Sequence, residues 1–151
     1  MQVSETDLNA RKQWLSLLAK SPPARLEELS SALGEAPGFE WLRAPEIGGV
    51  MVRGRAGGIG AAFNLGEMTV TRCALRLETG EVGHAYVQGR DKDHAQRAAL
   101  VDAMMQTERA HELRQNILHP LEAEAQAVRA RNAQKAGATK VDFFTMVRGE
   151  D

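Results

Sequence analysis

The sequence predicts an α+β fold with an N-terminal helical hairpin, a central antiparallel sheet of about four strands, two C-terminal helices and an apolar C-terminal arm. Three observations predict it. Leucines recur at helical spacing over residues 8–33, short apolar runs divided by glycines fill residues 39–89, and a stretch rich in Ala and Glu precedes an apolar end. We therefore expect one α+β domain over residues 1–137 and a partner-docking arm over residues 138–151.

Two helices are expected at the beginning of the chain. Ser4 precedes Asp7 by three residues, as in a capping arrangement, and apolar residues then recur at helical spacing as far as Ala19. Ser21 before two prolines reads as the N-cap of a second helix, which Gly34 ends. The chain should therefore open with a helical hairpin.

Four strands are expected next, at residues 39–43, 50–55, 68–77 and 82–88. Thr79-Gly80 predicts a tight turn that joins the last two strands into a hairpin. Alternation along the third strand separates a packed face from a solvated one. The packed face should carry Thr71, Cys73, Leu75 and Leu77, and the solvated face Arg72, Ala74 and Arg76.

Two further helices are expected after the sheet. Asp91 should cap a helix that runs to about Leu118, where Pro120 interrupts it. A polar, helix-forming segment follows from Leu121, and Gly137 should end it. The apolar tail beyond has little of its own domain to pack on, so we expect it to dock on another chain. Its expected docking residues are Phe143, Phe144, Met146, Val147 and Arg148.

Composition argues against several classes of partner. Nineteen basic and twenty acidic residues give a net charge of −1, so no whole-chain field attracts nucleic acid or an anionic membrane. No apolar run approaches the roughly 18 residues that a membrane span needs. The single cysteine, Cys73, excludes an internal disulfide framework and favours a reducing compartment. With a polar, acidic start to the chain, the expected location is the cytoplasm.

Catalytic and metal sites find little support in the sequence. The glycine run Gly57-Gly58-Ile59-Gly60 is similar to a phosphate-binding loop, but it is not followed by the Gly-Lys-Ser or Gly-Lys-Thr of that motif. His84 and His94 flank a strand-to-helix turn without a recognised metal-ligand spacing. No nucleophile, base and acid occur in a catalytic order, so we expect no catalytic residue, metal or cofactor in this chain.

A local anion site is the most specific chemical prediction. Arg90 and Lys92 lie where a strand ends on glycine and a helix begins, near exposed helix N–H groups. Together with Arg72 on the sheet and His94 on the helix, they form the candidate anion-binding set. The alternative is a set of solvated arginines, including Arg53, Arg55 and Arg76, neutralised by Glu67, Glu78 and Glu81.

Several motifs together resemble one known family. They are Arg11-Lys12-Gln13-Trp14, Leu18-Ala19, Gly57-Gly58-Ile59-Gly60, Phe63, Gly66-Glu67, Thr69-Val70-Thr71-Arg72-Cys73-Ala74, Arg76, Tyr86-Val87-Gln88-Gly89-Arg90-Asp91-Lys92, His94-Ala95, Ala99-Leu100, Asp102-Ala103, Gln106 and Val141-Asp142-Phe143-Phe144-Thr145-Met146-Val147-Arg148-Gly149. In these residues the chain resembles PhnG, the small subunit of the bacterial carbon–phosphorus lyase core complex.

The resemblance implies a subunit of an assembly for phosphonate breakdown. Such subunits pack with partner subunits, chiefly a nucleosidase-like one, in a complex that displaces adenine from ATP with a phosphonate to give a ribose 1-phosphonate 5-triphosphate. The family's iron–sulfur cluster belongs to another chain, in agreement with the single cysteine here. The alternative is a stand-alone anion- or nucleotide-binding transferase that uses the Gly57–Gly60 loop and the Arg90–His94 junction.

Overall fold

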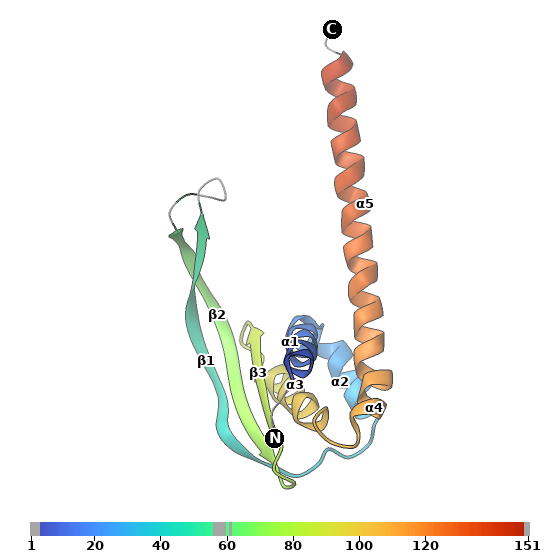
Figure 1. Cartoon of the computed structure of the whole chain (residues 1–151). Coiled ribbons are helices and arrows are strands. Elements are labelled where there is room, and N and C mark those ends of the chain that lie inside the picture. The colour runs from blue at the N-terminus through green and yellow to red at the C-terminus, as the bar shows by residue number, and fades with distance from the viewer. Residues whose placement is uncertain (1–3, 56–59, 61, 150–151) are drawn as a thin grey trace.

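The computed structural model describes the backbone of residues 4–55, 60 and 62–149, and the side chains of residues 4–54, 60 and 66–138. It confirms the α+β fold (Figure 1). Along the chain, the elements are α1 (Glu5–Lys20), α2 (Pro23–Ser31), β1 (Phe39–Arg55), β2 (Ala62–Leu77), β3 (Val82–Gln88), α3 (Lys92–Met104), α4 (Ala110–Leu113), a π-helical turn η2 (Arg114–Leu118) and α5 (His119–Gly149).

The described sheet has three antiparallel strands in the order β1-β2-β3, rather than about four. The first two predicted strands are joined in β1, which has 17 residues. Pro45 lies between the two predicted segments, in a register shift between Arg43 and Glu46. A proline has no N–H to pair and is tolerated at an irregularity of an edge strand, so the chain bends there without leaving the sheet.

The β2–β3 hairpin and its two faces are confirmed. The Leu77 N–H donates to Glu81 O at 2.9 Å across the turn, where Gly80 takes the left-handed φ of 106° that favours glycine. Thr71, Cys73, Leu75 and Leu77 are buried beneath α3, whereas Arg72 and Arg76 are exposed on the other face. Ala74 was also predicted to be solvated, but it is buried, because its small side chain lies between its larger strand partners Arg43 and His84. The arginine-bearing side of the sheet is called the outward face below.

The first helices are confirmed, with one correction at their junction. Ser4 caps α1 by accepting the Asp7 N–H at 3.1 Å, and Asp91 caps α3 by accepting the His94 N–H at 2.9 Å. Ser21, predicted to cap α2, ends α1 instead, and its hydroxyl donates to Leu18 O at 2.7 Å. Pro22 is the N-cap of α2, so that Pro23 supplies the preset φ of the first helical turn.

The core lies between the buried face of the sheet and helices α1, α2 and α3. Leu18, Leu26, Leu75, Leu113 and Ile117 are all fully buried there. Each such side chain contributes about 1.5–3 kcal/mol from the transfer of apolar surface out of water. The helical hairpin is therefore held to the sheet by a shared core.

The helix that was predicted to reach Leu118 ends at Met104. Thr107 stabilises the turn that follows, because its hydroxyl donates to Met104 O at 2.6 Å and accepts the Arg109 N–H at 3.2 Å. These two bonds satisfy backbone groups that would otherwise continue the helix. The chain then reverses into α4 and η2.

Neither Pro120 nor Gly137 ends a helix, in contrast to the prediction. Pro120 is the second residue of α5 and follows the π-helical turn η2. A π turn widens the backbone locally and accommodates the missing N–H, as at other helix irregularities. Gly137 costs about 1 kcal/mol relative to Ala but keeps its N–H, so the helix-forming residues around it carry α5 through to Gly149.

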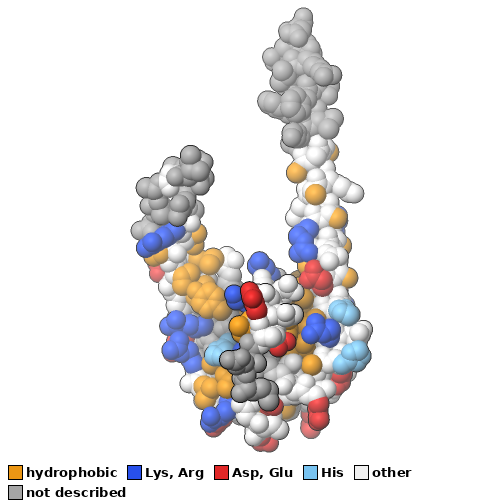
Figure 2. Space-filling model, viewed as in Figure 1, with side chains coloured by type: hydrophobic (Ala, Val, Ile, Leu, Met, Phe, Trp, Pro, Cys, Tyr) orange, Lys and Arg blue, Asp and Glu red, His pale blue; other side chains and the backbone are white. Residues whose placement is uncertain are grey.

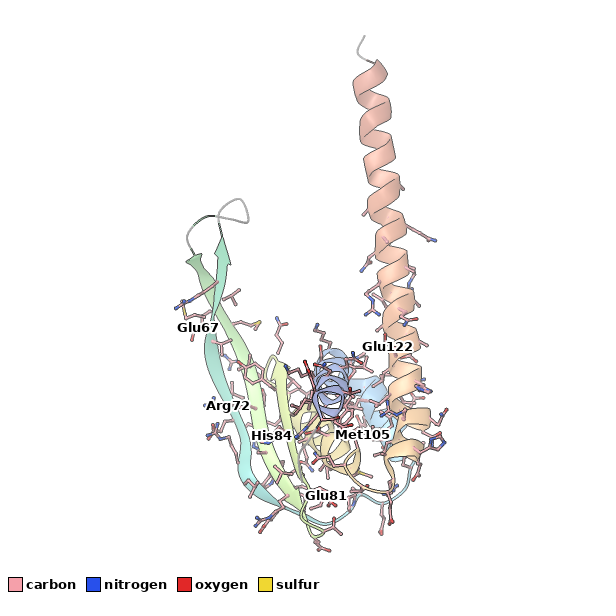
Figure 3. All side chains as sticks on the ribbon, viewed as in Figure 1. Glu67, Arg72, Glu81, His84, Met105 and Glu122 are labelled. Carbon is pink, nitrogen blue, oxygen red and sulfur yellow. The ribbon has the colours of Figure 1, made fainter. Side chains whose placement is uncertain are left out.

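Two arms project from the same side of the body (Figure 1). One arm, here called the ribbon, is the part of β1 and β2 beyond β3: pairing from Gly49↔Thr69 to Arg55↔Ala62 has no third strand, since β3 ends opposite Val70. The other is α5, which is exposed throughout residues 126–138. Glu67 on the ribbon and Glu122 near the base of α5 mark the two arms in Figure 3.

None of the helices in the described part of the chain is long and apolar enough to cross a bilayer. The long helix α5 is instead rich in Ala, Glu, Gln and Arg.

Candidate functional site

A buried carboxylate, Asp102, is the polar centre of the body. Its side chain is fully buried. One oxygen accepts from Arg11 Nε at 3.1 Å and from Trp14 Nε1 at 2.8 Å. The other accepts from Arg11 Nη2 at 2.9 Å and from the His84 backbone N–H at 2.8 Å. A buried charge is tolerated when it is paired and hydrogen-bonded in this way.

The network around Asp102 joins three elements. Arg11 and Trp14 belong to α1, Asp102 to α3 and His84 to β3. Val82 O extends the network, since it accepts from Arg11 Nη2 at 3.2 Å and from Gln106 Nε2 at 2.8 Å. The hydrogen bonds to Asp102 raise the pKa of the Arg11 guanidinium, outweighing the opposing effect of burial. The network therefore fixes α1 against the edge of the sheet.

Gly83 brings α3 unusually close to β3. A Cβ atom added to Gly83 would lie 2.0 Å from Ala99 O and 2.9 Å from the Ala103 methyl group. Only glycine allows this approach, and it is what lets the carboxylate of Asp102 reach the backbone of the next residue, His84.

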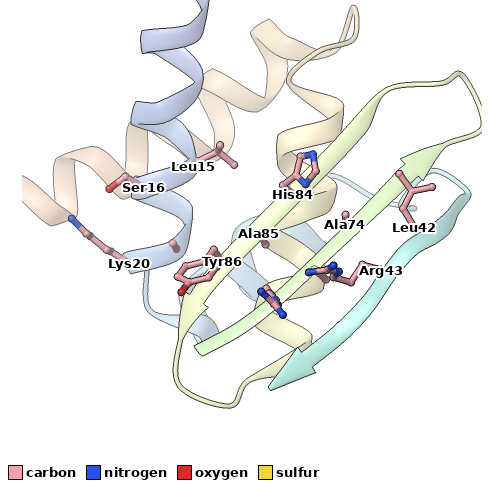
Figure 4. Close-up of a pocket in the computed structure, with 12 residues that line it drawn as sticks. Leu15, Ser16, Lys20, Leu42, Arg43, Ala74, His84, Ala85 and Tyr86 are labelled. Atoms are coloured by element: carbon pink, nitrogen blue, oxygen red, sulfur yellow. The ribbon is translucent and has the colours of Figure 1, made fainter. Parts of the chain in front are cut away.

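A pocket of about 780 Å³ opens between α1 and the outward face of the sheet (Figure 4). Figure 2 shows Lys and Arg side chains next to hydrophobic ones on the strand side of the body. The residues that line the pocket come from α1, β1, β2 and β3: Leu15, Ser16, Ala19, Lys20, Leu42, Arg43, Arg72, Cys73, Ala74, His84, Ala85 and Tyr86. Three of these described residues are cationic and none is acidic, so the pocket favours an anion.

The structure does not bring the four predicted anion-binding residues together. Arg72 lines the pocket on the outward face of the sheet. His94 lies on α3, beyond the other face, where it is 4% exposed and its Nε2 lies 2.9 Å from Leu18 O. A ring nitrogen held by a buried carbonyl is not available to an anion. Arg90 and Lys92 are exposed at the β3–α3 junction.

Two of the outward arginines have acidic partners other than those predicted. Arg72 Nε lies 3.5 Å from Glu46 Oε2, and Arg76 pairs with Glu40. Both glutamates belong to β1, which lies directly beside β2, so cross-strand pairing decides the partners. Arg53 is exposed on the ribbon.

Cys73 is buried, as predicted, and its Sγ lies 3.3 Å from Ala95 O. Burial raises the pKa of the thiol to about 11. The thiolate is the reactive form, so this cysteine is held in an inert state at neutral pH.

Other predicted positions lie partly outside the described residues. The backbone of residues 56–59 is not described, so the Gly57–Gly60 loop is represented only by Gly60. The side chains of Phe143, Phe144, Met146, Val147 and Arg148 are also outside the description, although their backbone belongs to α5. Within the ranges that are described, no group of three His, Cys, Asp or Glu side chains could hold a metal ion.

Sequence reasoning missed the role of Asp102. The sequence feature that could have indicated this role is a single acidic residue inside the apolar run from Ala98 to Met105. An acidic residue on the buried side of a helix requires a cationic or N–H partner, which Arg11 and Trp14 supply. The partner could not be identified beforehand because it lies about 90 residues away along the chain.

Comparison with known proteins places the chain beside one family. A family model described as phosphonate metabolism protein PhnG matches residues 9–149. The chain is also 46% identical over 142 residues to the alpha-D-ribose 1-methylphosphonate 5-triphosphate synthase subunit PhnG of Rhizobium meliloti (strain 1021). That match covers 93% of this chain and 90% of the relative.

Proposed function

Because the chain belongs to the phosphonate metabolism protein PhnG family, we propose that it is a structural subunit of a ribose 1-methylphosphonate 5-triphosphate synthase, the core complex of carbon–phosphorus lyase. The complex replaces the adenine of ATP with a phosphonate, and the chemistry is carried by a nucleosidase-like partner subunit. The assembly works in the cytoplasm. The role of this chain is to order that partner.

The observation that carries the proposal is the pair of arms. A two-stranded ribbon is only marginally stable in water, and a single helix without packing gains little beyond its propensity. α5 has 31 residues, about 46 Å at 1.5 Å per residue, yet residues 126–138 are all exposed. Two elements that bury so little on their own body are expected to bury their surfaces on partner chains.

Exposed apolar side chains along β1 support contact with a partner. Trp41, Leu42, Ile47 and Met51 are each more than one third exposed. Trp41 packs edge-on against Phe39, with ring centroids 5.0 Å apart, which holds the indole in a defined orientation. β1 is also an edge strand, so its outer backbone groups can pair with another chain.

The end of α5 supports a second contact. On a helical backbone, positions 143, 144, 146 and 147 fall within about 160° of arc, so they share one side of the helix. The four apolar docking positions thus share a helix face, which suits a groove on a partner.

Co-expression with the other subunits of the synthase tests this proposal. Replacement of Phe143 and Phe144 by serine should reduce the amount of partner that co-purifies with a tag on this chain, because it removes two large apolar contacts. The matched control replaces Leu8, an exposed apolar residue of α1 that lies outside both arms, by serine. Unchanged co-purification with the phenylalanine variant would show that the end of α5 does not dock.

A further inference from the structure

We propose that the pocket between α1 and the outward face of the sheet binds the triphosphate group of a sugar or nucleoside triphosphate. The preference for an anion follows from the pocket itself. The choice of a sugar-linked triphosphate rests on the proposed function, since the relative's enzyme is named for such a compound.

The positive groups of the pocket come from three different elements. Lys20 is at the end of α1, Arg43 is on β1 and Arg72 is on β2. Cations on separate elements can contact different phosphate groups of one triphosphate, and a guanidinium group does so with two parallel hydrogen bonds. The hydroxyls of Ser16 and Tyr86 add two neutral donors on the α1 side and the β3 side (Figure 4).

Arg72 can release its partner Glu46 and bind a phosphate instead. Its contact with Glu46 is 3.5 Å long, and both side chains are about half exposed. Such surface ion pairs contribute about 0–1 kcal/mol, so a multiply charged phosphate can replace the glutamate at little cost.

The pocket also offers a place for the uncharged part of the ligand. Leu15, Ala19 and Ala74 give it apolar walls, and the ring of Tyr86 is half exposed beside them. An aromatic ring next to apolar walls suits a sugar or a base joined to the phosphates. The volume of about 780 Å³ falls within the range of about 300–1,000 Å³ for small-molecule sites.

The walls of the pocket are fixed before any ligand binds. Asp102 accepts from Arg11 of α1 and from the His84 N–H of β3, and these are the two elements on either side of the pocket. The buried network thus sets the spacing between Lys20 and the outward face of the sheet. Preorganised walls lower the ordering cost of binding.

Titration calorimetry of the full chain with ATP, inorganic tripolyphosphate and adenosine tests the proposal. ATP and tripolyphosphate should bind and adenosine should not, and binding of ATP in preference to tripolyphosphate would show that the sugar and base are also held. Replacing both Lys20 and Arg43 by Gln should weaken ATP binding about a hundredfold, since a hydrogen bond to a charged group is typically worth about a factor of ten and two are lost. A second variant, Ser16→Trp, should block the pocket without a change of charge.

Matched controls separate the pocket from general surface charge. Arg76→Gln removes an exposed cation from the same strand and face outside the pocket, and Gln13→Trp adds an indole to an exposed position of α1 outside it. Both should bind ATP like the unchanged chain. Equal losses of ATP affinity in Arg76→Gln and in the double variant would overturn the proposal. Normal ATP binding by Ser16→Trp would also overturn it, as would failure of both ATP and tripolyphosphate to bind.

Co-purification of the same variants with the partner subunits distinguishes this inference from the proposed function. The pocket proposal expects the Lys20 and Arg43 double variant to assemble normally. If it assembles and still binds ATP as before, the pocket proposal is wrong while the subunit role stands.

Discussion

Asp102 is the residue on which the geometry of the body depends. Its two oxygens take up four hydrogen bonds from two side chains and one backbone N–H, in a fully buried position. The same carboxylate therefore stabilises the fold and sets one wall of the cationic pocket. Residue-level sequence reasoning identified Cys73 as buried and Arg72 as exposed, because strand alternation decides both, but a contact between α1 and α3 has no local signal.

Asp102→Asn should destabilise the chain by about 3 kcal/mol or more, because it leaves the partly buried Arg11 without its counter-charge. Urea unfolding followed by circular dichroism measures the change. Asp93→Asn is the matched control, since it removes an exposed carboxylate from the first turn of the same helix and should cost at most about 1 kcal/mol. Equal losses in the two variants would mean that the network adds no special stability.

Cys73 should react slowly with iodoacetamide in the folded chain. The raised pKa of about 11 leaves only a trace of thiolate at pH 8, and burial blocks access. Because the folded pKa lies above that of the free thiol, ionisation also lowers the stability as the pH rises above about 9. Mass spectrometry of alkylated protein should show protection in buffer and rapid reaction in urea. Fast alkylation in buffer would contradict the buried position.

At the scale of elements, glycines have different structural roles at different positions. Gly83 allows α3 to pack closely on β3. Gly137 lies in the exposed part of α5, where a Cβ atom would meet nothing within 4 Å. From the sequence, Gly83 was expected inside a strand and Gly137 at the end of a helix. The prediction of a break at Gly137 was wrong because helix propensity over a long segment outweighs one glycine. Pro120 is tolerated because it lies in the first turn of α5, directly after the π-helical turn η2.

Gly83→Ala should destabilise the chain by about 1–3 kcal/mol, since the added methyl group would press on Ala99 O and push α3 away from β3. Gly48→Ala is the control, because a Cβ there meets nothing within 4 Å. Thermal unfolding compares the two. A loss in Gly48→Ala as large as that in Gly83→Ala would point to backbone effects of glycine replacement rather than to the close approach.

Gly137→Ala should stabilise the outer part of α5 by about 1 kcal/mol, as expected for an exposed helix interior. Amide hydrogen exchange should slow on both sides of residue 137. The body should exchange as before, because Leu121 is the one buried residue in the part of α5 whose side chains are described. Unaltered exchange around residue 137 would show that this part of α5 is not helical in the isolated chain.

At the scale of the whole molecule, the chain is a small body with two projecting arms. The apolar end of the sequence predicted a docking segment, and the family motifs predicted a subunit, but the form of the arms was not predictable. The ribbon arises because β1 and β2 extend beyond the end of β3. This difference in strand length depends on the register in which the strands pair. The helix α5 extends because its composition favours helix while its surface has little to bury.

The most direct measurement of the central claim is the native mass of the species that co-purifies with a tag on this chain after co-expression with the other synthase subunits. The account predicts a stoichiometric complex, and loss of the partners when the chain is cut after residue 137 although its body remains folded. A tagged chain that elutes alone, soluble and folded, would contradict it.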